Sequence, residues 1–270
     1  MSYENLAEFL TKRGILVTGE DHLGHGKSVS EGGSFGYFCE QDPATVVVRD
    51  VHRLKKITEE QYPQVPYIIL GHSMGSFIAR NYLCRYGSGI GGAVIVGTGM
   101  QSAGLIFASK AMAGIQKLFC GSKHVSHFID KAAFGGYNKR IDSPRTSSDW
   151  LSRNTENVDR YIEDELCGFT FTVNGFQTLF ELIRRLQKQE NLEKVPQNLP
   201  ILMVSGAEDP VGDYGKGVHK ACDSLKRAGV KNITVKLYEN DRHELLNEDD
   251  AEVAMEDIWQ WICKEIPGIA

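Results

Sequence analysis

The segment Gly71-His72-Ser73-Met74-Gly75 follows directly on the apolar run Tyr67-Ile68-Ile69-Leu70. We interpret this as a strand, a very tight turn and the start of a helix. The glycines permit backbone conformations and close contacts that a Cβ atom would forbid. Such a turn lifts the Ser73 hydroxyl above the end of the strand, and the Met74 amide, at the N-terminus of the helix, points to the same place. The turn therefore predicts a nucleophile with one donor for an oxyanion.

Strands and helices alternate along much of the chain. Apolar runs predict strands over residues 15–17, 67–70, 93–96, 201–204 and 233–237. Helical spacing and end signals predict helices over 3–10, 43–58, 77–86, 217–228 and 249–263. Asp42 and Pro43 fit the N-cap and first helical position of the second helix. This alternation predicts an α/β fold in which helices flank a mostly parallel sheet.

The segment between the strands near Val96 and Ile201 has a different pattern. It predicts several helices without strand–helix alternation, which indicates a helical cap inserted above the sheet edge. We therefore expect an α/β core from residues 1–97 and 196–270, and a cap or lid from 98–195.

Composition narrows the function classes. A formal net charge of −5 argues against a nucleic-acid partner, and no segment approaches the roughly 20 apolar residues of a membrane span. The first residues lack an export signal, so we expect a cytoplasmic protein. Six scattered cysteines without a Cys-x-x-Cys pair indicate reduced, mostly buried thiols. Neither His22 with His25 nor His124 with His127 has a third ligand nearby, so we expect no metal or other cofactor.

A serine nucleophile needs a base and an acid that orients the base. Asp209 and His243 each follow an expected strand, in the chain order Ser, Asp, His, at the edge where Ser73 lies. Glu208 is an alternative to Asp209, and His219 and His22 are alternatives to His243. We expect Ser73, Asp209 and His243 to form a catalytic triad.

The sequence resembles α/β-hydrolases of the monoacylglycerol lipase and lysophospholipase group, which is also classed with serine aminopeptidase-like hydrolases. The resemblance covers nearly the whole chain. It rests on four segments: Asp21-His22-Leu23-Gly24-His25-Gly26-Lys27-Ser28, the serine turn, Gly206-Ala207-Glu208-Asp209-Pro210-Val211 and Arg242-His243-Glu244. It implies Ser73 as nucleophile, Asp209 as acid and His243 as base. Leu23 departs from the family, where arginine is common.

The resemblance also implies strands before the first helix, and a His-Gly loop that donates the second oxyanion amide. We find no residues here for that strand or that second donor. We therefore expect the chain to be either a shortened version of a working enzyme or a catalytically silent binding protein.

The leading hypothesis is a serine esterase that cleaves a small acyl ester, of monoacylglycerol or lysophospholipid type, through an acyl-enzyme. Peptidase or amidase action on the same triad is the alternative. Residues 100–153 carry eight basic and three acidic side chains, and their first part holds an apolar stripe: Leu105, Ala108, Met112, Ile115 and Phe119. The stripe is expected to pack on the core or, alternatively, to make transient contact with a lipid surface.

Overall fold

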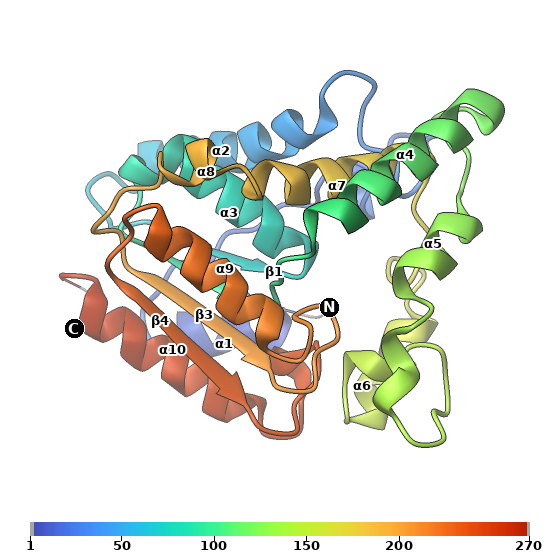
Figure 1. Ribbon diagram of the computed structural model, residues 1–270. Helices are drawn as coiled ribbons and strands as arrows, with labels where there is room; N and C mark the ends of the chain where they lie inside the picture. The colour runs from blue at the N-terminus through green and yellow to red at the C-terminus, as the bar shows by residue number, and fades with distance from the viewer. Residues whose placement is uncertain (1–2, 269–270) are drawn as a thin grey trace.

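The computed structural model describes residues 3–268, and its centre is a parallel sheet (Figure 1). Its strands lie side by side in chain order: β1 (Ile68–His72), β2 (Gly92–Val96), β3 (Ile201–Gly206) and β4 (Ile233–Tyr238). Because all neighbours are parallel, the segments that follow the strands leave from one edge of the sheet. The α/β prediction is confirmed.

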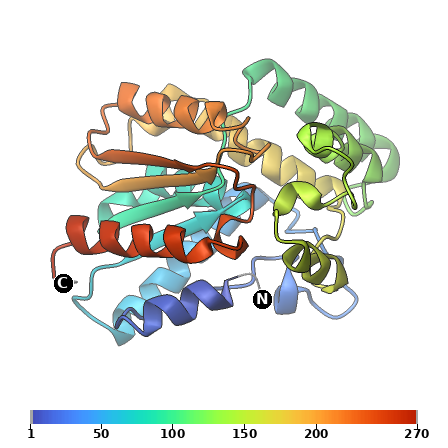
Figure 2. The same ribbon diagram turned by 90° about the horizontal axis from the view of Figure 1, so that it is seen from below.

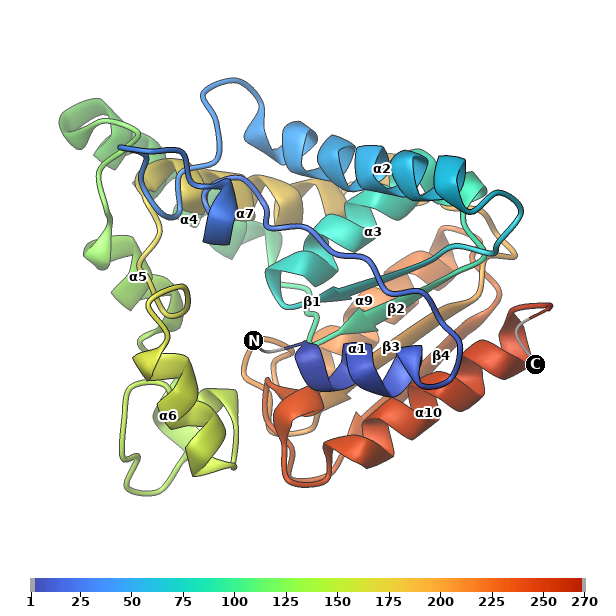
Figure 3. The same ribbon diagram turned by 180° about the vertical axis from the view of Figure 1, so that it is seen from behind.

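Helices cover both faces of the sheet, and the strand residues alternate between them. Ala93 and Ile95 of β2 pack with helices α2 (Pro43–Gln61), α3 (Met74–Tyr86) and α9 (Lys216–Arg227). Val94 and Val96 face α1 (Glu4–Thr11) and α10 (Ala251–Glu265). Figure 2 shows the sheet between these layers, and Figure 3 shows α1 beside α10. A strand buried on both faces needs a continuous apolar run. The sequences of β2 and β3 contain such runs, at residues 93–96 and 201–204.

The helices predicted from spacing are present, with ends shifted by at most three residues. Asp42 is the N-cap of α2, as expected; its carboxylate accepts from the Thr45 N–H, and Pro43 is the first helical residue.

The strand predicted at residues 15–17 is wrong. This segment follows α1 without regular secondary structure, and Leu16 is 48% exposed. A strand persists when its backbone groups pair with a neighbour. In the described part of the chain, β1 pairs with β2 on one side and makes no backbone hydrogen bond to residues 15–17 on the other.

The segment between β2 and β3 is helical, as predicted. Its helices are α4 (Ala103–Cys120), α5 (His127–Phe134), α6 (Thr155–Glu163), α7 (Val173–Leu186) and α8 (Gln189–Leu192). Short 3-10 turns occur within the described residues at Gly26–Ser28, Gly87–Gly89, Tyr137–Arg140, Asp149–Leu151 and Leu245–Asn247. Helix α7 packs on α3 and α2, whereas α5 and α6 stand to one side of the sheet (Figure 1).

Most of the apolar stripe of α4 does not pack on the core, although Met112 packs partly against it. Leu105, Ile115 and Phe119 are 56%, 58% and 85% exposed, whereas Ile106 and Ala113 are buried. The packing interpretation is therefore wrong for most of the stripe. The face of α4 that packs on α7 carries Ile106 and Ala113 instead, with Lys110 paired to Glu181 of α7.

All six cysteines are free thiols. Cys222 is buried, Cys120 is exposed and the other four are half-buried, so the expectation of mostly buried thiols is wrong. Among residues 3–268, no helix is both long and apolar enough to cross a bilayer.

The turn before α3 depends on a close approach at Gly71. A Cβ atom there would lie 2.3 Å from the Gly75 carbonyl oxygen and 2.8 Å from the Ala79 side chain, whereas a Cβ on Gly75 would meet open space. We expect Gly71→Ala to lower the free energy of unfolding by about 1–3 kcal/mol. Gly75→Ala, the matched control, should leave it unchanged within about 0.5 kcal/mol or raise it slightly, because alanine favours a helix. Thermal or denaturant unfolding measures both, and equal losses in the two variants would contradict the steric explanation.

Candidate active site

Ser73 occupies the turn between β1 and α3 in a conformation that L-residues rarely adopt, with φ 55° and ψ −123°. Such strain persists where surrounding bonds hold it, and it is common at functional sites. The Ser73 N–H donates to the Val96 carbonyl at the end of β2 (3.1 Å), and the Ser76 hydroxyl donates to the Ser73 carbonyl (2.6 Å). These two bonds fix the serine to the end of β2 and to the first turn of α3.

Asp209 lies in the loop after β3 and is completely buried. Its Oδ1 accepts from the Val211 N–H (2.8 Å), and its Oδ2 accepts from the Ser205 hydroxyl (3.2 Å) and faces His243 Nδ1 (3.0 Å). A buried carboxylate is tolerated when its oxygens have donors of this kind. Glu208, the alternative acid, is exposed, so the structure brings Asp209 to the imidazole.

His243 lies in the loop after β4 and is 2% exposed. Burial alone would lower the pKa of the imidazole, but the charge of Asp209 and the hydrogen bond to it outweigh burial, so the pKa is raised. In the described part of the chain, Nε2 is buried and has no hydrogen-bond partner. This nitrogen is available to exchange a proton. Of the alternatives, His219 is exposed on α9 and His22 lies beside Glu20.

His72, next to the serine, connects the turn to the His243 loop. Its Nε2 donates to the His243 carbonyl (2.9 Å), which fixes the tautomer, so its Nδ1 accepts from the Tyr3 hydroxyl (2.8 Å). Burial, and then the nearby His243, lower the pKa of His72 and keep it neutral. Sequence reasoning missed this residue, although its place inside the Gly-x-Ser-x-Gly turn was a signal.

The end of β2 lies against both imidazole rings. A Cβ atom added to Gly97, which has φ 56°, would lie 3.0 Å from His72 Cδ2 and 3.1 Å from His243 Cε1. The Ser73 N–H binds the residue just before Gly97. The serine turn and the imidazole therefore flank the same strand end, while Asp209 contacts the imidazole from the next strand.

Aromatic side chains from the segment between β2 and β3 cover His243. The Trp150 ring lies 5.1 Å from the imidazole, and the Tyr137 ring packs edge-on against Trp150 (4.9 Å). These rings exclude water from the imidazole, which strengthens its interaction with Asp209.

The loop that carries His243 is fastened to residues 149–153. Arg242 Nη1 donates to the carbonyls of Asp149 (2.7 Å) and Ser152 (3.0 Å), and Arg153 forms ion pairs with Asp241 and Asp250. Burial and the nearby acids raise the pKa of Asp241 to about 6. These contacts hold Trp150 in place against the imidazole.

The fold and this edge of the sheet define an α/β-hydrolase. A highly thermostable carboxyl esterase from Bacillus coagulans superposes with a TM-score of 0.90 at 29% identity, over 99% of this chain and 86% of that one. A lipase in an open form superposes with a TM-score of 0.85 at 25% identity, over 97% of this chain and 85% of that one.

The sequence profile of the family described as serine aminopeptidase, S33, matches residues 1–250, and the chain belongs to this family. The monoglyceride lipase of Rattus norvegicus is 29% identical over 91% of this chain and 72% of its own length. The monoacylglycerol lipase of Mycolicibacterium smegmatis is 26% identical over 98% of this chain and 84% of its own length. The sequence-based assignment to the monoacylglycerol lipase-like group is confirmed.

The two buried imidazoles should titrate differently. We expect the His243 pKa to lie above its ordinary value of about 6.5, and Asp209→Asn to lower it, because burial then acts without the opposing charge. Asp223→Asn, which removes an exposed carboxylate of α9, should leave it unchanged. Titration of the imidazole resonances by NMR measures this. A His243 that titrates below 6.5 in the unaltered protein would refute the assigned electrostatics.

Proposed function

We propose that the protein is a serine hydrolase that cleaves carboxylic esters through an acyl-enzyme. Ser73 is the nucleophile, His243 the base and Asp209 the acid that orients it. The observation that carries this proposal is the buried 3.0 Å contact between Asp209 Oδ2 and His243 Nδ1. In the described part of the chain it leaves His243 Nε2 without a partner, beside the end of β2 to which the Ser73 N–H binds.

The reaction follows from this arrangement. The Ser73 hydroxyl attacks the carbonyl carbon of the ester while His243 Nε2 takes its proton. The Met74 N–H, in the first turn of α3 where amides lack helical partners, receives the oxyanion. His243 then gives the proton to the leaving alcohol as the carbon–oxygen bond breaks. Water activated by the same imidazole releases the acid.

The comparisons support carboxylic esters as the substrate class, because the relatives are named monoglyceride lipases and the solved structures a carboxyl esterase and a lipase. We propose a small acyl ester of the monoacylglycerol or lysophospholipid type. The family description also names an aminopeptidase, so amide substrates belong in the test.

Residues 98–195 act as the cap in this proposal, over a core of residues 1–97 and 196–270. Support comes from Trp150 and Tyr137, which cover the imidazole, and from the position of α5 and α6 beside the sheet edge (Figure 3).

The exposed apolar side chains of the cap suit contact with a lipid surface. Phe107, Leu118, Phe119 and Phe128 are between 64% and 85% exposed on α4 and α5. Helices α4 and α5 contact each other, and large apolar side chains exposed on neighbouring helices are unusual in a protein without an apolar partner. We propose that this surface, the α4–α5 surface, contacts the lipid from which the substrate is taken.

Loss of the nucleophile should abolish covalent chemistry. A fluorophosphonate probe is expected to label the unaltered protein and Ser88→Ala, an exposed control, but not Ser73→Ala. Hydrolysis of p-nitrophenyl esters should fall by about 10⁶-fold in Ser73→Ala, while aminoacyl anilides should be poor substrates throughout. Labelling of Ser73→Ala would refute the assignment of the nucleophile. An unlabelled wild-type chain would favour a silent binding protein, and faster anilide cleavage a peptidase.

Polar substitution of the α4–α5 surface should affect emulsified substrates alone. We expect Leu118→Ser with Phe119→Ser to reduce turnover of emulsified long-chain monoacylglycerol by at least about tenfold, since full burial of one such side chain in lipid contributes about 1.5–3 kcal/mol and about 1.4 kcal/mol is a factor of ten. Hydrolysis of soluble p-nitrophenyl acetate should be unchanged. Val253→Ser, on the exposed face of α10, is the matched control, since Val253 is 54% exposed. An equal loss on both substrates would contradict a role in surface contact.

A further inference from the structure

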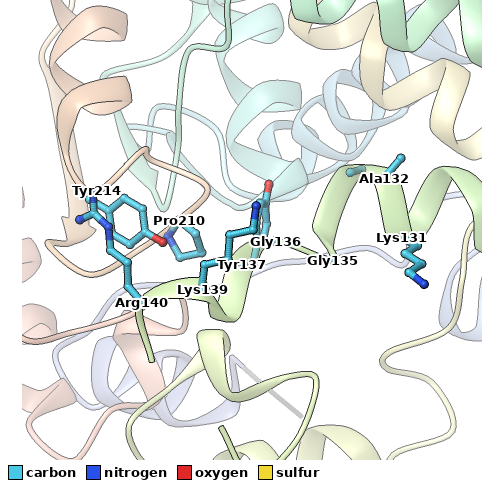
Figure 4. Close-up of a pocket in the computed structure, with 10 residues that line it drawn as sticks. Lys131, Ala132, Gly135, Gly136, Tyr137, Lys139, Arg140, Pro210 and Tyr214 are labelled. Atoms are coloured by element: carbon cyan, nitrogen blue, oxygen red, sulfur yellow. The ribbon is translucent and has the colours of Figure 1, made fainter. Parts of the chain in front are cut away.

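A hollow of about 570 Å³ lies between the cap and the loop that carries Asp209. Its cap side is formed by residues 131–140, from the end of α5 through the following 3-10 turn, and its core side by Pro210 and Tyr214 (Figure 4). Pro210 follows Asp209 directly, and Tyr137 packs on the Trp150 ring that covers His243. The hollow is therefore adjacent to the proposed catalytic groups.

The lining of this hollow carries positive charge alone. Lys131, Lys139 and Arg140 line it, and among residues 3–268 no acidic side chain does. The Lys139 side chain lies over Gly136, because a Cβ atom on Gly136 would be 3.4 Å from its Nζ. Other basic side chains of the cap are used differently: Lys110 pairs with Glu181, Arg145 with Asp159 and Arg153 with Asp241. The cations of the hollow thus remain available to a ligand.

Arg140 is held in place by the core. Its guanidinium carbon lies 3.5 Å from the centroid of the Tyr214 ring, a stacking contact visible in Figure 4. Tyr214 and the preceding Asp213 both adopt left-handed backbone conformations, with φ of 55° and 48°, and the Tyr214 N–H donates to the Asp209 carbonyl (2.9 Å). A strained loop that presents an aromatic platform to an arginine indicates a functional constraint.

A smaller hollow of about 220 Å³ adjoins the first and shares Tyr137, Arg140 and Tyr214 with it. It contains the nearest acid, Glu208, but also Arg153 and Arg242. Those two arginines already bind Asp241 and backbone carbonyls. The excess of positive charge therefore extends across both hollows.

We propose that this basic hollow binds the anionic head group of the acyl ester, a phosphate monoester carried on the glycerol, with Lys139 and Arg140 as its contacts. The proposal rests on the proposed ester hydrolysis and specifies its substrate class. A phosphate offers oxygens to both the ammonium and the planar guanidinium. The ester carbonyl lies on the same glycerol, and to reach Ser73 it would have to enter beside the Tyr137 and Trp150 rings, which lie between the hollow and His243.

Two soluble substrates with the same short acyl chain test this: monodecanoylglycerol and decanoylglycerol 3-phosphate. We expect Lys139→Gln and Arg140→Gln each to lower kcat/KM on the phosphorylated ester by about five- to tenfold, chiefly through KM. In Lys139→Gln the neutral ester should change by less than twofold, and this variant carries the comparison because Arg140 also stacks on Tyr214 of the Asp209 loop. Lys117→Gln, an exposed lysine of α4, is the control. The difference between the substrates should shrink as salt rises. Equal losses on both esters would overturn the proposal.

Binding separates this inference from the proposed chemistry. With Ser73→Ala, calorimetry should detect decanoylglycerol 3-phosphate, and Lys139→Gln in that background should weaken the binding by a similar factor. The calorimetric measurement tests the head-group site even if neither ester is hydrolysed. A lack of hydrolysis would refute the proposed function but not the head-group site. If glycerol 3-phosphate binds as tightly as its acylated form, the hollow is a site for a free phosphate ester and the head-group assignment fails. Binding that is indifferent to Lys139 would also overturn it.

Discussion

The buried contact between Asp209 and His243 is the interaction on which the site depends. A carboxylate without exposure is costly unless donors surround it, and here they come from Ser205, Val211 and the imidazole. Two of these belong to the end of β3 and its loop, and the third to the loop after β4. The contact therefore requires β3 and β4 to end at the same level, as their parallel register from Ile201–Ile233 to Gly206–Tyr238 ensures.

The serine turn meets the same edge through a second set of bonds, made largely by backbone. His72 donates to the His243 carbonyl, and the Ser73 N–H donates to Val96. The imidazoles of His72 and His243 both pack against Gly97, where a side chain would collide with them. The spacing between the ends of β1, β2 and β4 is therefore set by this contact rather than by loop length. A rigid edge of this kind favours pre-organised chemistry, since little reorientation is needed before the proton moves.

The sequence alone predicted the parts of this arrangement that depend on residues close together in the chain. Apolar runs predicted β1 to β4, and polar residues in the segments after β1, β3 and β4 pointed to Ser73, Asp209 and His243. It was insufficient where a partner lies far away in the chain. The role of His72 depends on a carbonyl 171 residues later. The buried face of α4 depends on α7, and the strand expected at residues 15–17 failed because strand formation depends on pairing rather than on apolar composition.

Residues 98–195, the proposed cap, contact the loops after β3 and β4, where the chemistry is proposed to occur. Arg242 and Arg153 tie residues 149–153 to the His243 loop, while Arg140 stacks on Tyr214 in the Asp209 loop. Each of the two loops that carry the proposed acid and base thus has its own cationic contact with the cap. A ligand anion that drew Arg140 away from Tyr214 would act on the loop of Asp209, whose carbonyl holds the Tyr214 backbone. If the hollow binds the head group as proposed, residues 209–214 connect that binding to the orientation of the imidazole.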